Sequence, residues 1–219
     1  MKNPSDSRAR VPAAEPRAVL FDLLTALLDS AALWDAVAGG AEKGLPWRET
    51  YLRNTYAAGA YRPYEQLVRE AAGQVGLPEI LADRLVSRYG ELAPWPEVNE
   101  VLETLARRFR LAVVTNCSER LGRIAAARIG VAFGVVVTAE RAGYYKPHPG
   151  PYGLALEALG EAPETVLFVA GSPYDLVGAA AIGMSVFWHN RLRMTAPPGA
   201  PAPLAQHDNL YPLLRLVMR

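Results

Sequence analysis

"AVLFDLLTALLDS", residues 18–30, places a single carboxylate, Asp22, directly after a short apolar run. The run predicts a buried strand, and a charge at the end of such a strand costs free energy unless a partner or a reaction uses it. Asp22 is therefore a candidate functional residue. Leu23 and Leu24 follow it, so the surroundings of this carboxylate are unusually apolar.

Four further apolar runs predict strands of the same kind. They are unbroken rather than alternating, which is typical of strands buried on both faces. Segments with helical periodicity lie between the later runs. Strands that alternate with helices form parallel βαβ units, so we expect a doubly wound α/β sheet with ligands at the carboxyl ends of its strands. The four runs are "RLAVVT" (110–115), "GVVVT" (134–138), "TVLFVA" (165–170) and "SVFW" (185–188).

The interval 30–94 contains only helical patterns, and it is too long for a simple crossover between strands. It predicts a helical cap inserted after the first strand. The α/β core then comprises residues 17–29 and 95–219, and residues 1–16 read as a mobile arm. Within the core, the proline-rich stretch 195–206 predicts a surface loop before a final helix.

The composition describes an ordinary globular protein with no large charge excess. The chain has 219 residues and a formal net charge of +1, so no overall field attracts nucleic acid or an acidic membrane. No apolar stretch is long enough for a membrane span. The single cysteine, Cys117, cannot form an internal disulfide. We therefore expect a cytoplasmic protein whose partner is a small molecule.

Polar residues stand at the ends of four of the predicted strands. Each alone has an ordinary explanation as a helix cap, a turn residue or a solvated charge. Together they bring two acids, a lysine, hydroxyls and an amide to one edge of the sheet, which favours a catalytic site. In chain order they are Asp22, Thr115 with Asn116, Lys146, and Ser172 with Asp175.

This order of motifs resembles the haloacid dehalogenase superfamily over residues 18 to 190, including the helical insert. Members of that superfamily hydrolyse bonds through an aspartyl-enzyme ester. The closer similarity is to the 2-haloacid dehalogenase branch, which has a Trp-Arg pair on the cap, here Trp47 and Arg48. That branch also has a tyrosine six residues after the loop lysine, as Tyr152 follows Lys146, and "ELAPWPEV" resembles its hinge.

The resemblance implies a role for each of these positions. Asp22 would be the nucleophile, Lys146 would orient it, and Asp175 would hold Lys146 or prepare the hydrolytic water. The other side chains would bind the substrate: Thr115 and Asn116 as oxyanion donors, Arg48 opposite a carboxylate or the departing halide, and Leu24, Tyr152 and Ser172 beside them. The resemblance also implies a homodimer.

Two positions argue against a metal-dependent phosphatase. Phosphatases of the superfamily carry a proton-donating aspartate where this chain has Leu24, and a metal-binding carboxylate where it has Gly171. Halide needs no proton to leave, whereas an alkoxide does. We therefore expect no metal or other cofactor, or at most a weak Mg²⁺ site at Asp22 and Asp175. On the same reasoning, Gly171→Asp should raise the affinity for Mg²⁺.

Three substitutions depart from the dehalogenase pattern. Thr25-Ala26 stands where the branch has Gly-Thr, and Ala170 and Ser172 replace a serine and an asparagine. Hydrolytic dehalogenation of a small 2-haloacid or a related small acid remains the leading hypothesis. A magnesium-dependent small-molecule phosphatase is the second hypothesis. A non-catalytic binding protein on a degenerate hydrolase scaffold is the third.

Overall fold

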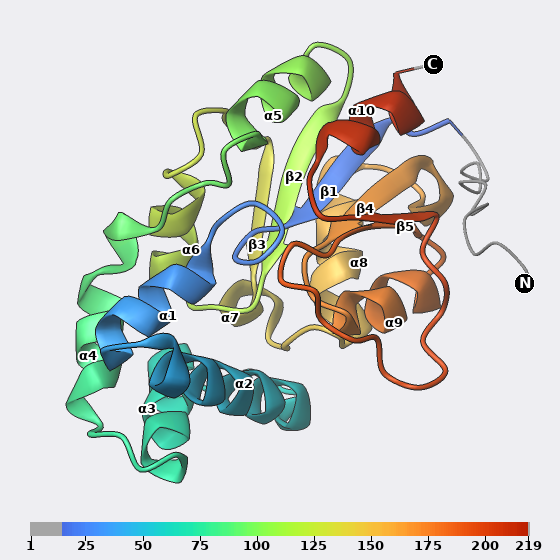
Figure 1. The fold of residues 1–219 in the computed structure, drawn as a ribbon. Coiled ribbons are helices and arrows are strands. Elements are labelled where there is room, and N and C mark those ends of the chain that lie inside the picture. The colour runs from blue at the N-terminus through green and yellow to red at the C-terminus, as the bar shows by residue number, and fades with distance from the viewer. Residues whose placement is uncertain (1–14, 219) are drawn as a thin grey trace, which may run out of the picture.

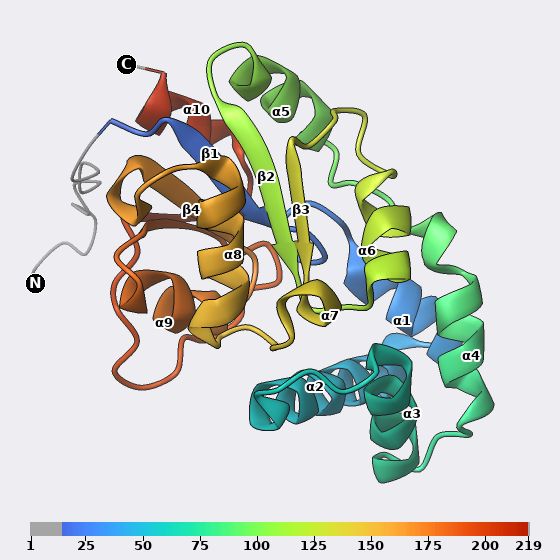
Figure 2. The same ribbon diagram turned by 180° about the vertical axis from the view of Figure 1, so that it is seen from behind.

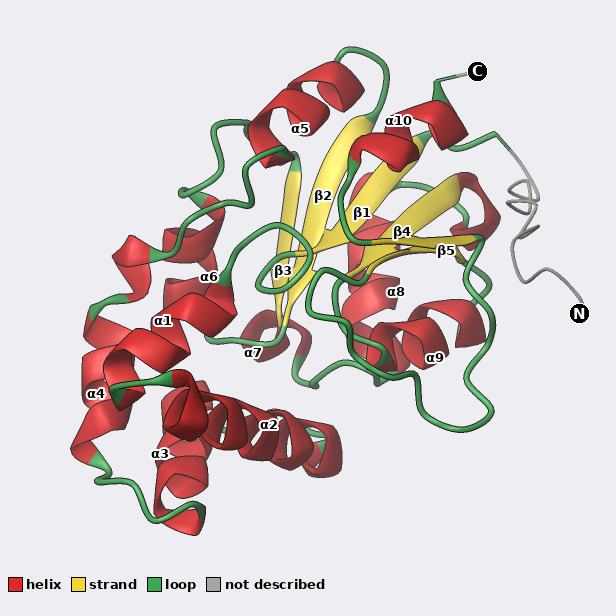
Figure 3. Cartoon of the chain, viewed as in Figure 1, coloured by secondary structure: helices red, strands yellow, loops and turns green. Residues whose placement is uncertain are grey.

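A parallel six-stranded sheet forms the centre of the protein. The computed structural model describes residues 15–218, and its strands have the order β3-β2-β1-β4-β5-β6, with every neighbouring pair parallel (Figure 3). The five strands expected from the sequence are present, which confirms the doubly wound α/β fold. Their bounds are β1 Ala18–Asp22, β2 Arg110–Thr115, β3 Val135–Thr138, β4 Val166–Ala170 and β5 Ser185–His189.

Successive residues of β1 face opposite sides of the sheet and enter two separate hydrophobic cores. Val19 and Phe21 pack into one core, whereas Ala18 and Leu20 pack into the other. A strand with both faces covered has no solvent side, so the unbroken apolar pattern of these strands follows from the layered fold.

Helices cover both faces of the sheet (Figure 2). The first core includes residues of α5, α6 and α10, and the second includes residues of α8 and α9. The short helices α7 and η2 connect neighbouring elements. The bounds are α5 Val98–Ala106, α6 Glu119–Ala126, α7 Ala139–Ala142, α8 Pro149–Leu159, η2 Pro163–Thr165, α9 Tyr174–Ala181 and α10 Tyr211–Val217.

The interval 30–94 is helical and contributes no strand to the sheet, as expected. Its helices gather at one end of the molecule, beyond the carboxyl end of β1 (Figure 1). A β-bridge between Leu28 and Pro94 joins the segments by which the chain enters and leaves this group. The helices are α1 Ser30–Ala38, α2 Ala41–Ala58, α3 Tyr64–Gln74, α4 Ile80–Ser87 and η1 Tyr89–Glu91.

The prediction of a loop over 195–206 is wrong at its end, because β6 covers Ala205–His207 and pairs with β5. This edge strand carries few apolar residues, so its sequence gives no strand signal, and pairing with β5 alone determines it. The predicted mobile arm, residues 1–16, lies almost wholly outside the described residues. None of the helices in 15–218 combines the length and the apolarity that a membrane crossing requires.

Candidate active site

Asp22 is the last residue of β1, and its carboxylate is held at both oxygens. Residues 23–29 form a tight turn after the strand, here called the nucleophile loop. The backbone N–H groups of Thr25 and Ala26 donate to Oδ2 of Asp22 at 3.0 and 3.1 Å. Lys146 Nζ donates to Oδ1 at 2.8 Å. Residue 26 is an alanine where the 2-haloacid dehalogenase branch has a threonine, so it offers no side-chain hydroxyl. In this chain two backbone N–H groups hold Oδ2 of Asp22.

Lys146 lies between the two acids of the site. Its Nζ is 2.8 Å from Asp22 Oδ1 and 3.1 Å from Asp175 Oδ1, and its side chain is buried. Burial lowers the pKa of Lys146, but the charges of Asp175 and Asp22 and their hydrogen bonds outweigh burial and raise it above the ordinary value of 10.5. Lys146 therefore stays charged and compensates both carboxylates.

Asp175 lies in the first turn of α9 and is fully enclosed. Its Oδ1 accepts a hydrogen bond of 2.7 Å from the hydroxyl of Tyr152. Burial raises the pKa of Asp175, and the nearby charge of Asp22 adds to this, while Lys146 and the Tyr152 hydrogen bond act in the opposite direction; the net change is upward. A carboxylate with a raised pKa is a stronger base, which suits proton removal from water.

Asn116 positions Lys146 through the backbone. Its Oδ1 accepts from the N–H of Lys146 at 2.7 Å, and its Nδ2 donates to the carbonyl of Lys146 at 3.0 Å. The preceding residue, Thr115, is completely buried and turns its hydroxyl toward Cys117 Sγ at 3.7 Å.

Arg48 reaches the site from helix α2. It is 5% exposed, and its NH2 donates to Oγ1 of Thr25 at 3.1 Å. Trp47, its neighbour, points the other way and donates Nε1 to the carbonyl of Val68 at 2.9 Å. The two neighbouring residues therefore make different contacts: the tryptophan connects α2 to α3, and the arginine contacts the nucleophile loop.

A cavity of about 40 Å³ lies between these residues. It brings together seven of the nine predicted site residues: Asp22, Leu24, Arg48, Asn116, Lys146, Ser172 and Asp175. Thr115 and Tyr152 do not line this cavity. Tyr152 is completely buried behind Asp175, so both residues support the site from outside rather than face a ligand.

Seven lining residues were not anticipated from the sequence. Two of them connect the helical group to the core: Tyr51 donates to the carbonyl of Asn116 at 2.7 Å, and the hydroxyl of Tyr56 lies 2.8 Å from Ser172 Oγ. Aromatic residues at helical spacing are typical of a buried face, so their sequence pattern does not distinguish a cavity wall from a core. The seven are Thr25, Ser30, Trp34, Tyr51, Leu52, Tyr56 and Tyr64.

Gly171 is required by close packing against the nucleophile loop. A Cβ at this position would lie 2.3 Å from the nitrogen of Ala26 and 2.7 Å from Oδ2 of Asp22. The expectation that Gly171→Asp would raise the affinity for Mg²⁺ stays a prediction, and the contacts of this backbone weigh against it. A side chain at residue 171 has no space unless the nucleophile loop moves.

Comparisons with known proteins agree with this geometry. A family model described as haloacid dehalogenase-like hydrolase matches residues 16–183. Haloacetate dehalogenase H-2 of Moraxella sp. (strain B) is 33% identical over 191 residues, which cover 80% of this chain and 85% of that protein. Phosphoglycolate phosphatase of Aquifex aeolicus (strain VF5) is 30% identical over 185 residues, covering 76% of this chain and 81% of the phosphatase.

A solved structure shows the same likeness in three dimensions. The L-2-haloacid dehalogenase of Xanthobacter autotrophicus with chloropropionic acid covalently bound has a TM-score of 0.81 and 27% identity, and the match covers 93% of this chain and 98% of that one. The parallel sheet with its flanking helices agrees with the family match. The chain therefore belongs to the haloacid dehalogenase-like hydrolase family.

Proposed function

We propose that the protein hydrolyses the carbon–halogen bond of a small 2-haloacid through an ester on Asp22. One observation carries the proposal: the Asp22 carboxylate lines a small cavity beside Leu24, a side chain that cannot protonate a leaving group. A halide leaves without a proton, whereas an alkoxide does not. The haloacetate and 2-haloacid dehalogenases among the relatives support the same substrate class.

In the first step, Oδ1 of Asp22 attacks the carbon that bears the halogen. A carbon–oxygen bond forms, the carbon–halogen bond breaks, and the halide leaves with the bonding electrons. Oδ1 is the suitable nucleophile because it accepts only from Lys146, whereas Oδ2 accepts two backbone N–H groups. Leu24 keeps the carboxylate poorly solvated, which increases its reactivity.

In the second step, water attacks Cγ of the Asp22 ester, and the bond between Cγ and Oδ1 breaks as the hydroxy acid leaves. Its alkoxide oxygen takes up the proton that Asp175 removes from the water, and Asp22 then loses the remaining proton to solvent. Asp175 accepts the proton of the attacking water. Negative charge develops on Oδ2, where the N–H groups of Thr25 and Ala26 already point. These two groups thus act as an oxyanion hole. Removal of one such donor typically lowers the rate about 10²–10³-fold.

The cavity favours the smallest haloacids. Its volume of about 40 Å³ gives room for roughly three waters at ~10–15 Å³ each. Chloroacetate and 2-chloropropionate are therefore the substrates we expect. Apart from Lys146, Arg48 is the cationic side chain among the described residues that line the cavity, so it would pair with the substrate's anionic group.

We also propose that the reaction needs no metal. Among residues 15–218, no group of three or more His, Cys, Asp or Glu side chains is placed to hold an ion. The sequence allows a weak Mg²⁺ site between Asp22 and Asp175. In the structure the ammonium group of Lys146 lies between these two carboxylates. A dication there would be repelled by that charge.

Halide and phosphate release, measured side by side, test the function. We expect chloride from chloroacetate and 2-chloropropionate at rates unchanged by EDTA or added Mg²⁺, and negligible phosphate from p-nitrophenyl phosphate. Phosphate release that EDTA abolishes and Mg²⁺ restores would establish the phosphatase alternative, which the phosphoglycolate phosphatase relative supports. Tight binding of a haloacid without turnover would establish the non-catalytic alternative.

The raised pKa of Lys146 predicts the alkaline limit of activity. Lys146 must be protonated to hold Asp22, and its pKa is raised above the ordinary 10.5, so the alkaline decline of kcat/KM should be centred above pH 10.5, with a level profile up to about pH 9.5. Short assays after a pH jump, with a check that activity returns at pH 8, measure this limit. A decline centred well below pH 10 would contradict the assigned role of Lys146.

Assembly and location complete the proposal. The resemblance to the 2-haloacid dehalogenase branch supports a homodimer. The single cysteine, Cys117, is buried and supports a reducing, cytoplasmic location. A small-molecule partner, without nucleic acid or membrane, agrees with the net charge of +1.

A further inference from the structure

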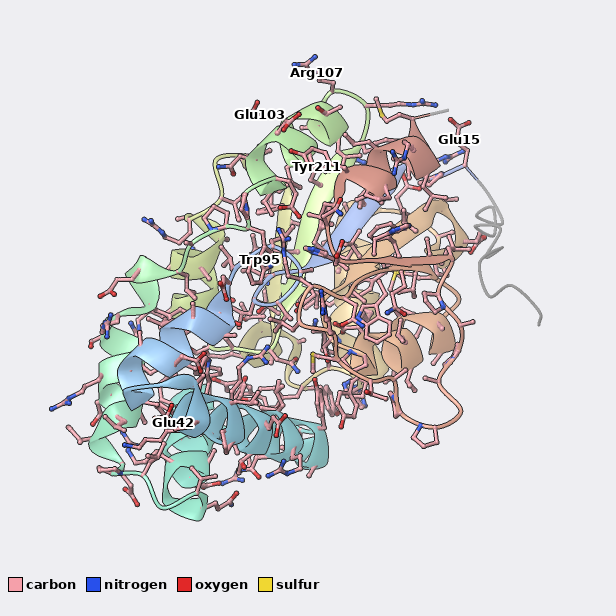
Figure 4. The ribbon with its side chains drawn as sticks, viewed as in Figure 1. Glu15, Glu42, Trp95, Glu103, Arg107 and Tyr211 are labelled. Carbon is pink, nitrogen blue, oxygen red and sulfur yellow. The ribbon has the colours of Figure 1, made fainter. Side chains whose placement is uncertain are left out.

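Two nitrogen donors hold the nucleophile loop from the side opposite Asp22, and the proposed reaction assigns them no role. The indole Nε1 of Trp95 donates to the carbonyl of Thr25 at 3.0 Å. The ring Nδ1 of His189 lies 2.7 Å from the carbonyl of Ala26. Trp95 comes from the segment between η1 and α5, and His189 ends β5, so both are distant from the loop in sequence (Figure 4 labels Trp95).

The Trp95 hydrogen bond connects to Asp22 through one peptide group. The carbonyl of Thr25 and the N–H of Ala26 belong to the same amide, and that N–H donates to Asp22 Oδ2 at 3.1 Å. A donor on the carbonyl side polarises the amide and strengthens its N–H as a donor. Trp95 therefore acts on the charge of Asp22 without touching it. The backbone N–H of Trp95 donates to the carbonyl of Leu27 at 3.0 Å, which ties the Trp95 backbone to the nucleophile loop as well.

His189 holds the next peptide of the loop, whose N–H, on Leu27, donates to the carbonyl of Leu23 at 3.2 Å rather than to Asp22, so His189 fixes the turn that carries the Ala26 donor. A carbonyl oxygen can only accept, so Nδ1 is the protonated nitrogen of the ring. Burial lowers the pKa of His189 from its usual 6.5, which keeps the ring neutral at neutral pH. Its Nε2 lies 3.7 Å from Glu97 Oε1 and has no hydrogen-bond partner among the described residues. The ring is thus fully buried with one nitrogen bonded, and that bond is to the nucleophile loop.

An ion pair between buried Glu97 and partly exposed Arg191 lies beside both donors. Arg191 NH2 donates to Glu97 Oε2 at 2.5 Å, and the guanidinium lies 4.9 Å from the centre of the Trp95 ring. Glu97 also accepts the N–H of Leu210 at 3.2 Å. Buried charges are retained when they are paired and hydrogen-bonded, and here the pair fixes the ring of Trp95 and closes off that of His189.

We propose that Trp95 and His189 are positioning residues of the nucleophile loop: Trp95 holds the peptide whose N–H is the Ala26 donor of the oxyanion hole, His189 holds the peptide that follows it, and together they set the rate of ester hydrolysis. The inference rests on the proposed function for its kinetic consequence. The hydrogen bonds to the carbonyls of Thr25 and Ala26 themselves do not depend on it.

The central experiment compares two matched indole deletions, Trp95→Phe and Trp188→Phe. Trp188 is buried, and its Nε1 has no hydrogen-bond partner among the described residues, so its replacement removes the same group without removing a bond. We expect Trp95→Phe to lower kcat for chloroacetate by up to about tenfold and to lower KM with it, so that kcat/KM stays close to wild type, because one net hydrogen bond is worth about a tenfold change in rate and only the second step is slowed. Trp188→Phe should retain the wild-type kcat.

The step affected separates positioning from general stability. In acid-quenched samples analysed by mass spectrometry, the fraction of enzyme carrying the Asp22 ester should rise in Trp95→Phe, because only ester hydrolysis is slowed. His189→Leu should show the same rise, and His189→Asn, which keeps a donor near the position of Nδ1, should recover most of the wild-type rate. Equal losses in Trp95→Phe and Trp188→Phe, or wild-type kcat in Trp95→Phe, would overturn the inference.

The amide proton shift of Ala26 gives a readout that needs no turnover. It should move upfield in Trp95→Phe, as its bond to Asp22 weakens, and stay in place in Trp188→Phe. If the wild type releases no halide, the proposed function fails while this shift still tests the positioning role. An unchanged Ala26 shift in Trp95→Phe in a dehalogenating enzyme would reject the positioning role alone.

Discussion

Asp22→Asn will reduce halide release from chloroacetate to background while the protein remains folded. The amide oxygen is a far weaker nucleophile than the carboxylate and has nearly the same volume, so the loss should be at least ~10³-fold, as for deletion of other covalent nucleophiles. Lys146 keeps Asp175 as an ionic partner at 3.1 Å, so the site does not retain an unpaired buried charge. Halide release and thermal melting, measured on the same preparation, test both halves of this expectation.

Asp83→Asn is the matched control for the change of charge. Asp83 lies on α4 with its carboxylate on Arg69 at 2.6 Å, and both side chains are well exposed. A surface ion pair of this kind contributes little, so activity and melting should stay close to wild type. Substantial turnover by Asp22→Asn, with no ester detectable in the quenched protein, would exclude the covalent mechanism.

Gly171→Ala is expected to have the second largest effect. The new Cβ would lie 2.3 Å from the nitrogen of Ala26 and 2.6 Å from the carbonyl carbon of Thr25, both backbone atoms, so the nucleophile loop must move. Overpacking of this kind costs about 1–3 kcal/mol of folding free energy. Displacement of the Ala26 N–H also weakens the oxyanion hole, and we expect kcat to fall by about 10²-fold.

Gly153→Ala tests whether the effect belongs to the position rather than to the substitution. Gly153 lies inside helix α8 with nothing within 4 Å of a new Cβ. Alanine in a helix interior is favoured over glycine by about 0.5–1 kcal/mol, so this variant should be as active as the wild type and slightly more stable. Wild-type activity in Gly171→Ala would show that the nucleophile loop is not held as closely as the structure indicates.

The close approach at Gly171 also explains the absence of the phosphatase carboxylate. The sequence presents Gly171 as a missing ligand, as if restoring it needed only one substitution. In the structure the nucleophile loop occupies the volume that such a side chain would need. The tight turn that carries Leu24 therefore packs directly against Gly171. Replacement of Gly171 by a residue with a carboxylate would displace this loop before it created a metal site.

Local patterns in the sequence were sufficient for the sheet and for the charged centre of the site. Unbroken apolar runs predict strands buried on both faces, and parallel strands necessarily present their carboxyl ends at one edge. Asp22, Lys146 and Asp175 could therefore be grouped from the sequence. In the structure Lys146 Nζ lies 2.8 Å from Asp22 Oδ1 and 3.1 Å from Asp175 Oδ1. β6 was missed because its three residues carry no apolar pattern and depend on pairing with β5.

The sequence by itself was sufficient to group the candidate site residues at one edge of the sheet; only the tertiary structure decided what each one touches. Thr115 and Tyr152 were expected to bind the substrate, yet both are completely buried outside the cavity. Tyr51 and Tyr56 each follow an apolar residue of α2 by four positions, as core residues do, and become cavity walls. The physical reason is that periodicity encodes which face of an element is buried, whereas the partner on that face depends on how α2, the nucleophile loop and β5 pack together. Contacts such as Trp95 with Thr25, 70 positions apart in the chain, exist only after that packing.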